Sequence, residues 1–285
     1  MNAPKIDDYF IRKLFTNSII VAVYALLVLF FLGPVLWIVS LALRTPQELF
    51  GAPRLLPRNP TLENFTYILT RTQMPTYIWN SVRLVVYSVV GTLAVSIPSA
   101  YSFSRFSFRN KTGLLLIVLL FQMISPVVIG IPLFRYFASI GLLNNYFGLS
   151  MVYIAIQTPF ATFLLKGVLD GVPRELDESA HIDGASRFQV LRAIIIPSAM
   201  SGIASAVIFI SINSWSQFII PFFLLNRNSL YPVAVGVLMA QGHFTDISIQ
   251  YVAAASVVGL LPAVILVLFL QKFILSALLA GALKG

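Results

Sequence analysis

The chain has 285 residues, of which 58% are hydrophobic and only 10% carry a charge. Soluble domains carry roughly 25% charged residues, so the composition excludes an ordinary soluble protein and indicates lipid as the main solvent. The net charge of +9 comes from basic residues scattered singly beside apolar segments, which indicates membrane orientation and argues against nucleic acid as a partner. The chain has no cysteine, which excludes disulfides, thiol catalysis and cysteine-based metal sites.

Three long segments, at 14–43, 193–226 and 247–271, contain no Asp, Glu, Lys or Arg. About 20 apolar residues cross a bilayer as a helix, and a helix satisfies its own backbone polar groups there. We predict an all-α polytopic membrane protein with six transmembrane helices, at about 17–43, 78–103, 113–133, 148–168, 199–222 and 251–272. The first apolar segment is too long for a cleaved signal peptide, so we expect it in the mature protein.

The segments between the predicted spans have distinct compositions. Residues 44–77 contain five prolines, which favours an ordered loop outside the membrane over a further span. Prolines also occur in or near three of the spans and indicate broken helices that line a pathway, namely Pro126, Pro132, Pro159 and Pro221.

The distribution of Lys and Arg predicts the orientation. If the N-terminus is cytoplasmic, twelve of the 19 basic residues lie on the inner side and seven on the outer side. Basic residues are enriched in cytoplasmic segments, so we expect both termini and the segment 169–198 in the cytoplasm, where ATP is available.

The segment 169–198 is the one long stretch in which charge concentrates. Half of the ten acidic residues lie between positions 170 and 183. We predict two short helices here, the first beginning at Pro173 with Glu175 and Asp177 in its first turn. Gly184 is expected to end this helix in a left-handed conformation. Ser186 and Gln189 have the spacing of a capping box that starts the second helix.

The second predicted helix has an apolar face and ends at a proline. Phe188, Leu191 and Ile195 are expected to share one face, and Pro197 is expected to open the next span. On the first helix, Leu176 and Ala180 are expected to form a small apolar ridge. A polar helical insert between spans, without catalytic chemistry of its own, suggests a docking surface for a soluble partner.

At these residues the sequence resembles the permease subunits of bacterial ABC importers. Their motif reads Glu-Ala-Ala, three residues, Gly, nine residues, Ile, one residue and Leu-Pro. Here Glu178, Ala180, Gly184, Ile194 and Pro197 match it, while Ser179 and Ile196 depart from it conservatively. Asp183-Gly184-Ala185 matches the Asp-Gly-Ala core that is common in the family.

The resemblance covers about 78–275 and divides the chain into three parts. Residues 1–77 hold the N-terminal segment, the first span and the outer loop, 78–275 the permease core and 276–285 a cytoplasmic tail. Several short segments narrow the resemblance to the carbohydrate importers and to the maltose-type second permease, namely Pro34-Val35-Leu36-Trp37, Asn64-Phe65, Asn80-Ser81, Asn213-Ser214-Trp215 and the tail from Ala280 to Gly285.

The resemblance implies the partners of the chain in the bacterial inner membrane. A second, homologous permease would complete the pathway, an ATPase dimer would receive the insert, and a periplasmic or lipid-anchored sugar-binding protein would deliver the substrate. ATP and Mg would bind the ATPase, so this chain would hold no cofactor. The tail 280–285 would reach the ATPase interface.

The resemblance also assigns roles to the insert. Glu178 would bond within the docked surface, Ala180 would be small so that the ATPase can approach, and Gly184 would set the angle between the helices. Ser179, Asp183, Ala185, Ile194 and Pro197 complete the predicted ATPase-coupling set. Lys166, Arg174, Arg187 and Arg192 are expected to anchor lipid headgroups more than to contact the ATPase.

Polar side chains within the spans are candidates for the substrate path, because polar groups in lipid are costly unless they face a cavity or a partner. Sugar sites combine amides with aromatic faces, so we select Gln122, Tyr153, Gln157, Asn213, Trp215 and Gln217. Hydrogen bonding between helices explains each of these residues equally well.

Rival functions fit the sequence less well. Neither His181 nor His243 lies in a span, they are too far apart in sequence for a metal site, and there is no Gly-x-Ser-x-Gly, so we expect no enzyme. The phosphate-loop motif is missing, so ATP must be hydrolysed by another chain. An ion-coupled secondary transporter would usually place a carboxylate within the membrane, whereas every acidic residue here lies outside the predicted spans. A membrane scaffold stays possible but leaves the insert unexplained.

Overall fold

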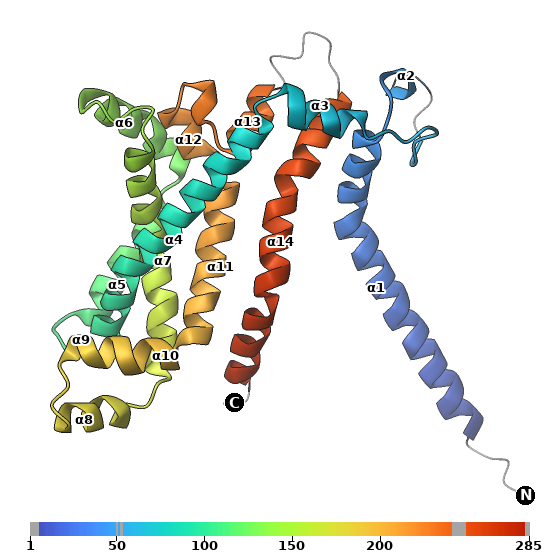
Figure 1. Ribbon diagram of the computed structural model, residues 1–285. Helices are drawn as coiled ribbons and strands as arrows, with labels where there is room; N and C mark the ends of the chain where they lie inside the picture. Colours follow the sequence, from blue (N-terminus) through green and yellow to red (C-terminus); the bar gives the residue numbers. More distant parts are fainter. Residues whose placement is uncertain (1–5, 50, 52–53, 241–248, 283–285) are drawn as a thin grey trace, which may run out of the picture. The chain divides into compact units, whose positions relative to one another are not determined.

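The computed structural model describes residues 6–49, 51, 54–240 and 249–282, and within these ranges the chain forms helices and connecting segments with no strand. Four stretches of helix have the length and composition of membrane spans, namely Phe15–Ala42, Met74–Arg105, Tyr146–Asp170 and Ile249–Phe269. They lie in α1 (Ile6–Ala42), α4 (Met74–Arg105), α7 (Tyr146–Asp170) and α14 (Ile249–Ala282), as drawn in Figure 1. The all-helical membrane fold is confirmed.

The third predicted span is not straight. It consists of α5 (Lys111–Leu120), the 3₁₀ turn η1 (Phe121–Met123) and α6 (Pro126–Ser139), and the two halves are bent by 88°. Pro126 has no backbone N–H and holds Ser125 in an extended conformation, at φ −62° and ψ 132°. The predicted break at Pro126 is therefore confirmed, whereas Pro132 and Pro159 lie inside α6 and α7.

The fifth predicted span is interrupted as well. It begins with α11 (Met200–Ser216), which meets the preceding helix at 81°, and continues after two non-helical residues as α12 (Ile219–Leu224). Pro221 lies inside α12, so the break precedes it. The count of six spans holds if each bent pair crosses the membrane once, and it stays a prediction.

By contacts the chain divides into two compact units, Met1–Arg71 with Phe244–Val258, and Thr72–His243 with Gly259–Gly285. In the first unit, α1 exposes large apolar side chains from Phe15 to Ile38, as a helix in lipid does. The described part of the loop after it contains α2 (Pro46–Leu49) and α3 (Glu63–Arg71). Asn64 Nδ2 donates to the carbonyls of Ala42 and Arg44, each at 2.8 Å, which fixes α3 to the end of α1.

The second unit is a bundle in which α4 packs along α7 and α11 (Figure 1). On α4, Ser88, Thr92 and Ser96 recur every four residues and are fully buried. Small side chains in such a row let membrane helices approach closely. Gly202 on α11 serves the same purpose, because a Cβ there would overlap the side chain of Val168 on α7.

The start of α4 is tied to the connection before α13 (Val233–Ala240). Asn80 Nδ2 donates to the carbonyls of Ser229 and Tyr231 at 2.9 and 3.1 Å, and Ser81 Oγ accepts from the Val233 N–H at 2.8 Å. Asn80-Ser81 therefore has a structural role that explains its presence before the second span.

Candidate functional site

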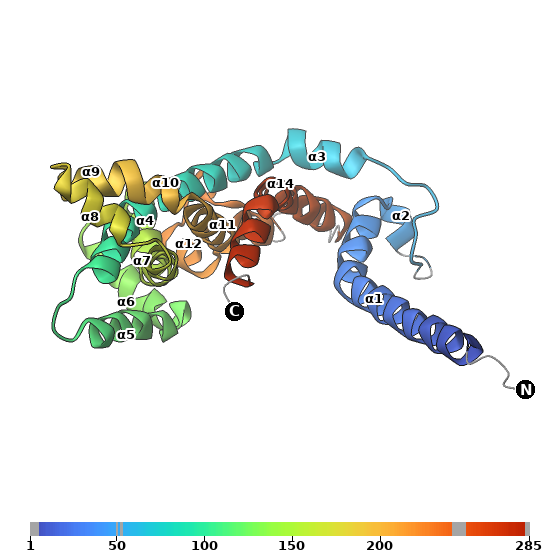
Figure 2. The ribbon, with the colours of Figure 1, turned by 90° about the horizontal axis from the view of Figure 1, so that it is seen from below.

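The insert 169–198 folds as two helices at one end of the second unit, next to the C-terminal ends of α4 and α7 (Figures 1 and 2). The first helix, α8, spans Glu175–Ile182 and carries Glu175, Asp177 and Glu178 in its first turn, near the positive end of the helix dipole. Its N-cap is Arg174, so Pro173 precedes the helix instead of opening it as predicted.

The end of α8 is built on Gly184. Its φ is +82°, a conformation that favours glycine, and its N–H donates to the His181 carbonyl at 3.1 Å. The next N–H, of Ala185, reaches the Ala180 carbonyl at 2.9 Å, which completes a Schellman motif. The predicted left-handed turn is confirmed.

The second helix of the insert begins at the predicted capping box. The Gln189 N–H donates to Ser186 Oγ at 3.4 Å, and the Ser186 N–H donates to Gln189 Oε1 at 2.7 Å. The helix runs through α9 (Arg187–Val190), the π-helical turn η2 (Leu191–Ile195) and α10 (Ile196–Ser198). Pro197 lies in its last turn, before the bend, so the next span opens at Met200 and not at Pro197.

The prediction of one shared apolar face is wrong for Phe188. Leu191 and Ile195 are buried in the core, but Phe188 is 70% exposed. The buried face of this helix consists of Val190, Leu191 and Ile195, and Phe188, one turn earlier, lies outside it.

The inner face of α8 packs on the chain itself. Ala180 is only 8% exposed and belongs to the core cluster that includes Leu165, Leu169 and Val190. This placement corrects the reason given for a small residue at this position. Ala180 lets α8 approach its own bundle, and its Cβ does not face outward beside Leu176, which is exposed.

The outer face of the insert combines acidic and apolar side chains. Ile182 is 86% exposed, the highest value among the exposed large hydrophobic residues of the described chain, and Phe188 accompanies it from the second helix. Five residues of the predicted coupling set are exposed, namely Glu178, Ser179, Asp183, Gly184 and Pro197, while Ala185 and Ile194 are half-buried. Exposed apolar side chains beside charges are typical of a protein-docking surface.

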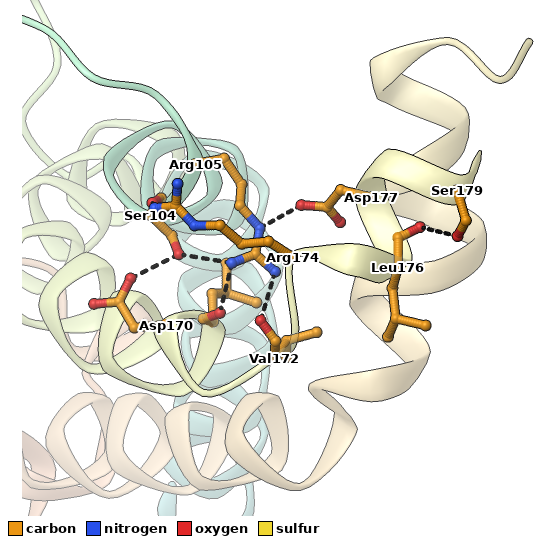
Figure 3. Close-up of polar contacts among 9 residues, drawn as sticks. Ser104, Arg105, Asp170, Val172, Arg174, Leu176, Asp177 and Ser179 are labelled. Carbon is orange, nitrogen blue, oxygen red and sulfur yellow. Dashed lines mark hydrogen bonds and ion pairs between the residues drawn. The ribbon is translucent and has the colours of Figure 1, made fainter. Parts of the chain in front are cut away.

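A polar cluster that the sequence did not indicate joins α8 to the bundle (Figure 3). Arg105, the last residue of α4, forms an ion pair through Nε with Asp177 of α8, and both side chains are nearly buried. The same guanidinium donates from Nη1 to the Leu169 carbonyl at 3.2 Å and from Nη2 to the Val172 carbonyl at 3.0 Å. One side chain therefore contacts the end of α7 and α8 together.

Three further contacts surround this ion pair. Arg174 Nη2 donates to the Ser104 carbonyl at 3.2 Å, and Ser104 Oγ donates to Asp170 Oδ1 at 2.7 Å. Lys166 Nζ donates to Asp170 Oδ2 at 2.5 Å. Two of the four basic residues predicted as headgroup anchors, Lys166 and Arg174, thus make hydrogen bonds within the chain.

The other two basic residues differ. Arg187 lies over the ring of Phe106 at 4.7 Å, and Arg192 is exposed on η2. No short motif in the sequence indicates the pairing of Arg105 with Asp177. Asp177 shares the inner face of α8 with Ala180, three residues later, and a buried carboxylate needs a cation, but only the structure shows that this face points inward.

The candidate path residues do not gather into one site. Tyr153 and Gln157 are buried inside the bundle, where Gln157 Nε2 donates to Ser214 Oγ of α11 at 3.0 Å. They do not lie on an open surface of this chain, and Gln157 connects helices, the alternative that the sequence had left open.

The remaining candidates lie closer to the surface. Gln122 and Asn213 are exposed, and Asn213 Nδ2 donates to the Phe209 carbonyl of its own helix at 3.0 Å. Trp215 Nε1 donates to the Gly259 carbonyl at 3.1 Å, and Gln217 follows the end of α11 half-buried. Asn213 and Gln122 are therefore the candidates with exposed side chains, although Gln122 Nε2 also donates to the Ile156 carbonyl of α7.

Metal binding has no support in the described part of the chain, where no group of three His, Asp or Glu side chains is placed to hold an ion. His181 Nδ1 lies 3.0 Å from the Ala185 carbonyl oxygen and helps to close the turn. His243 and the tail end 283–285 lie outside the described residues, and α14 continues to Ala282.

Residues 88–279 match the family model of the binding-protein-dependent transport system inner membrane component. The chain belongs to this family. This ABC importer permease is a multi-pass inner-membrane transport component and not an enzyme. The family motif falls on the helix-turn-helix at 169–198 described above.

Individual relatives agree with this assignment. The sulfoquinovosyl glycerol transport system permease protein SmoH of Agrobacterium fabrum is 29% identical over 89% of this permease and 89% of its own length. The trehalose/maltose transport system permease protein MalG of Thermococcus litoralis is 31% identical over 89% and 92%, respectively. A crystal structure of a bacterial ABC transporter involved in the import of the acidic polysaccharide alginate matches 95% of this permease and 99% of that chain with a TM-score of 0.75, and at 22% identity it supports the fold.

Proposed function

We propose that this permease carries a sugar or a sugar derivative into the cell as one half of an ATP-driven importer. The observation that carries the proposal is the exposed face of the insert, which displays Ile182 and Phe188 beside Glu178 and Asp183 at the family motif. The names of the relatives support the sugar class, since they include trehalose/maltose, galactooligosaccharide and sulfoquinovosyl glycerol permeases.

The proposed partners follow from the phosphate-loop motif that the sequence lacks and from the apolar surface that the bundle exposes. Its sequence has no phosphate-loop motif, so an ATPase dimer binds ATP and Mg and receives the insert. A second homologous permease covers the apolar surface that one bundle leaves exposed, and a periplasmic or lipid-anchored binding protein delivers the sugar. One solved relative is a bacterial alginate ABC transporter in complex with an alginate pentasaccharide-bound periplasmic protein, which supports the last partner.

The proposed orientation places both termini and the insert in the cytoplasm. The excess of Lys and Arg on that side supports it. The insert lies at the same end of the bundle as the C-terminal ends of α4 and α7 (Figure 1), so ATP-driven closure of the ATPases pushes on these two helices first. Movement of α4 and α7 then changes the side from which the pathway opens.

Asn213 and Gln122 are the proposed substrate-facing residues of this half. Both side chains are exposed, Asn213 on α11 and Gln122 in the turn η1, and each belongs to a bent helix pair of membrane-spanning composition, where an exposed amide is costly in lipid. The other four candidates have a structural role, because packing and hydrogen bonds in this group hold α7, α11 and α14 in place. They are Tyr153, Gln157, Trp215 and Gln217.

Reconstitution tests the proposal. Vesicles that contain both permeases and the ATPase, supplied with the binding protein, should take up substrate when ATP is present on the cytoplasmic side. Vesicles that contain this permease alone, with a proton or sodium gradient and no ATPase, should take up none. Gradient-driven uptake by the isolated chain would instead support an ion-coupled secondary transporter.

A further inference from the structure

Asp177 differs from the other acidic residues of α8 in the direction that its side chain takes. Glu175 and Glu178 are exposed in the same first turn, whereas Asp177 is 7% exposed and paired with Arg105. An acidic residue that faces away from the docking surface does not contribute to docking directly. Its role must concern the connection between α8 and the bundle.

Arg105 occupies the point at which three structural elements meet. It is the last residue of α4, its two terminal nitrogens hold the carbonyls of Leu169 and Val172 at the end of α7, and its Nε faces Asp177. Planar guanidinium groups fix the orientation of several acceptors at once, which an ammonium group does not. In Figure 3 the contacts of Arg105 extend from the α7 end on one side to α8 on the other.

A second set of contacts joins α8 and α7 to Ser104, at the end of α4. Arg174, the N-cap of α8, donates to the Ser104 carbonyl at the end of α4, and Ser104 Oγ donates to Asp170 on α7. Each helix end is thus held by a side chain of another element. Basic groups at helix C-termini are also favoured by the helix dipole, so α4 and α7 both gain from these contacts.

We propose that Arg105 and Asp177 form a mechanical latch that makes α8 move as a rigid extension of α4 and α7. The proposal rests on the proposed function, in which an ATPase pushes on the exposed face of α8. With the latch closed, a displacement of α8 is passed to both spans. Without it, α8 still docks through Ile182 and Phe188 but tilts on the bundle, and the displacement is lost. Arg105 and Asp177 are positioning residues, since neither contacts ATP or substrate.

The latch should be tested in the assembled importer, by ATP hydrolysis with and without the binding protein purified with its native ligand. The signal from the binding protein must cross the membrane through the permease to reach the ATPase. In the wild-type importer we expect stimulation. In Asp177→Asn we expect the ATPase to co-purify as in the wild type. The rate of ATP hydrolysis with the binding protein should fall to about the rate measured without it.

Two further variants make the result specific. Glu175→Gln removes an exposed carboxylate from the same helix turn and should keep the wild-type stimulation. Asp177→Asn leaves Arg105 buried without a counter-ion, which can impair folding, so the double variant Arg105→Gln/Asp177→Asn removes both charges together. The double variant should assemble and also lose stimulation.

The outcomes separate the latch from the proposed function. A wild-type chain that neither binds the ATPase nor responds to the binding protein would contradict the proposed function itself. A responsive wild type together with wild-type stimulation in the double variant would overturn the latch alone. Failure of the double variant to assemble would also overturn it, because the pair would then serve folding and not transmission.

Discussion

Gln157 on α7 donates a hydrogen bond from Nε2 to Ser214 Oγ on α11 at 3.0 Å, and both residues are buried between the helices. The bond fixes the register of two helices that also meet through Gly202 and Val168. Ser214 directly follows the candidate path residue Asn213 on α11, so this bond holds the part of α11 that carries Asn213 against α7.

The Gln157–Ser214 bond should contribute measurably to stability. Ser214→Ala leaves the amide of Gln157 with only the Tyr153 carbonyl of its own helix at 3.3 Å. Hydrogen bonds between membrane helices contribute about 0.6 kcal/mol on average and up to about 1.7 kcal/mol, so we expect a loss of about 1 kcal/mol. Reversible unfolding in mixed micelles measures it. Ser216→Ala is the matched control, because Ser216 is exposed and bonds only within its own helix.

Close helix approach at Gly202 gives a second prediction. A Cβ at this position overlaps the Val168 side chain, so Gly202→Ala forces the helices apart and should cost about 1–3 kcal/mol. Gly167→Ala, one residue from Val168, adds a methyl group where no neighbouring atom lies within 4 Å and should be nearly neutral or slightly stabilising. Equal unfolding free energies for the two variants would contradict this packing.

The turn at Gly184 should be essential for coupling. Gly184→Pro cannot adopt a φ of +82° and also loses the N–H that caps α8. We expect normal membrane insertion, but ATP hydrolysis that no longer drives uptake, measured together in proteoliposomes. Gly184→Asn tolerates the left-handed conformation and should keep most uptake. Normal transport by Gly184→Pro would refute the role of the turn.

The exposed apolar residues should provide much of the docking energy. Ile182→Asp places a charge where we expect contact with the ATPase and should weaken docking at least about tenfold, or about 1.4 kcal/mol. Quantitative co-purification, or titration of ATPase into nanodiscs, measures the change. Val90→Thr, on the exposed membrane face of α4, is the control, and it should bind as the wild type does.

Charge reversal at Glu178 tests the acidic part of the same face. Glu178→Lys keeps a long side chain on an exposed position but inverts its charge in the first turn of α8, so it should reduce coupling without unfolding the permease. Uptake per ATP hydrolysed is the relevant measurement. An unchanged ratio would show that Glu178 lies outside the docked surface.

The sequence predicted most of the fold because apolar segment length depends on the bilayer and not on tertiary detail. The spans at 17–43, 78–103 and 148–168, the Gly184 turn and the capping box at Ser186 are confirmed. Local rules identified them, since each depends on residues that are close together in the chain.

The errors have a common physical cause. The exposed side chain of Phe188 and the inward side chains of Ala180 and Tyr153 all depend on which elements pack against each other. The Arg105–Asp177 pair joins residues 72 positions apart, and no short motif reports such a contact. The division at 77 and 275 and the assignment of coupling residues stay predictions.

The most direct test of the account is a photo-cross-link from position 182. The chain has no cysteine, so Ile182→Cys provides a single attachment site for a photoreactive label on the most exposed apolar residue of the insert. Val90→Cys, on the membrane face of α4, serves as the control position. The account predicts a covalent adduct with the ATPase subunit from position 182 and none from position 90. An ATPase that remains bound and active without any adduct from position 182 would contradict it.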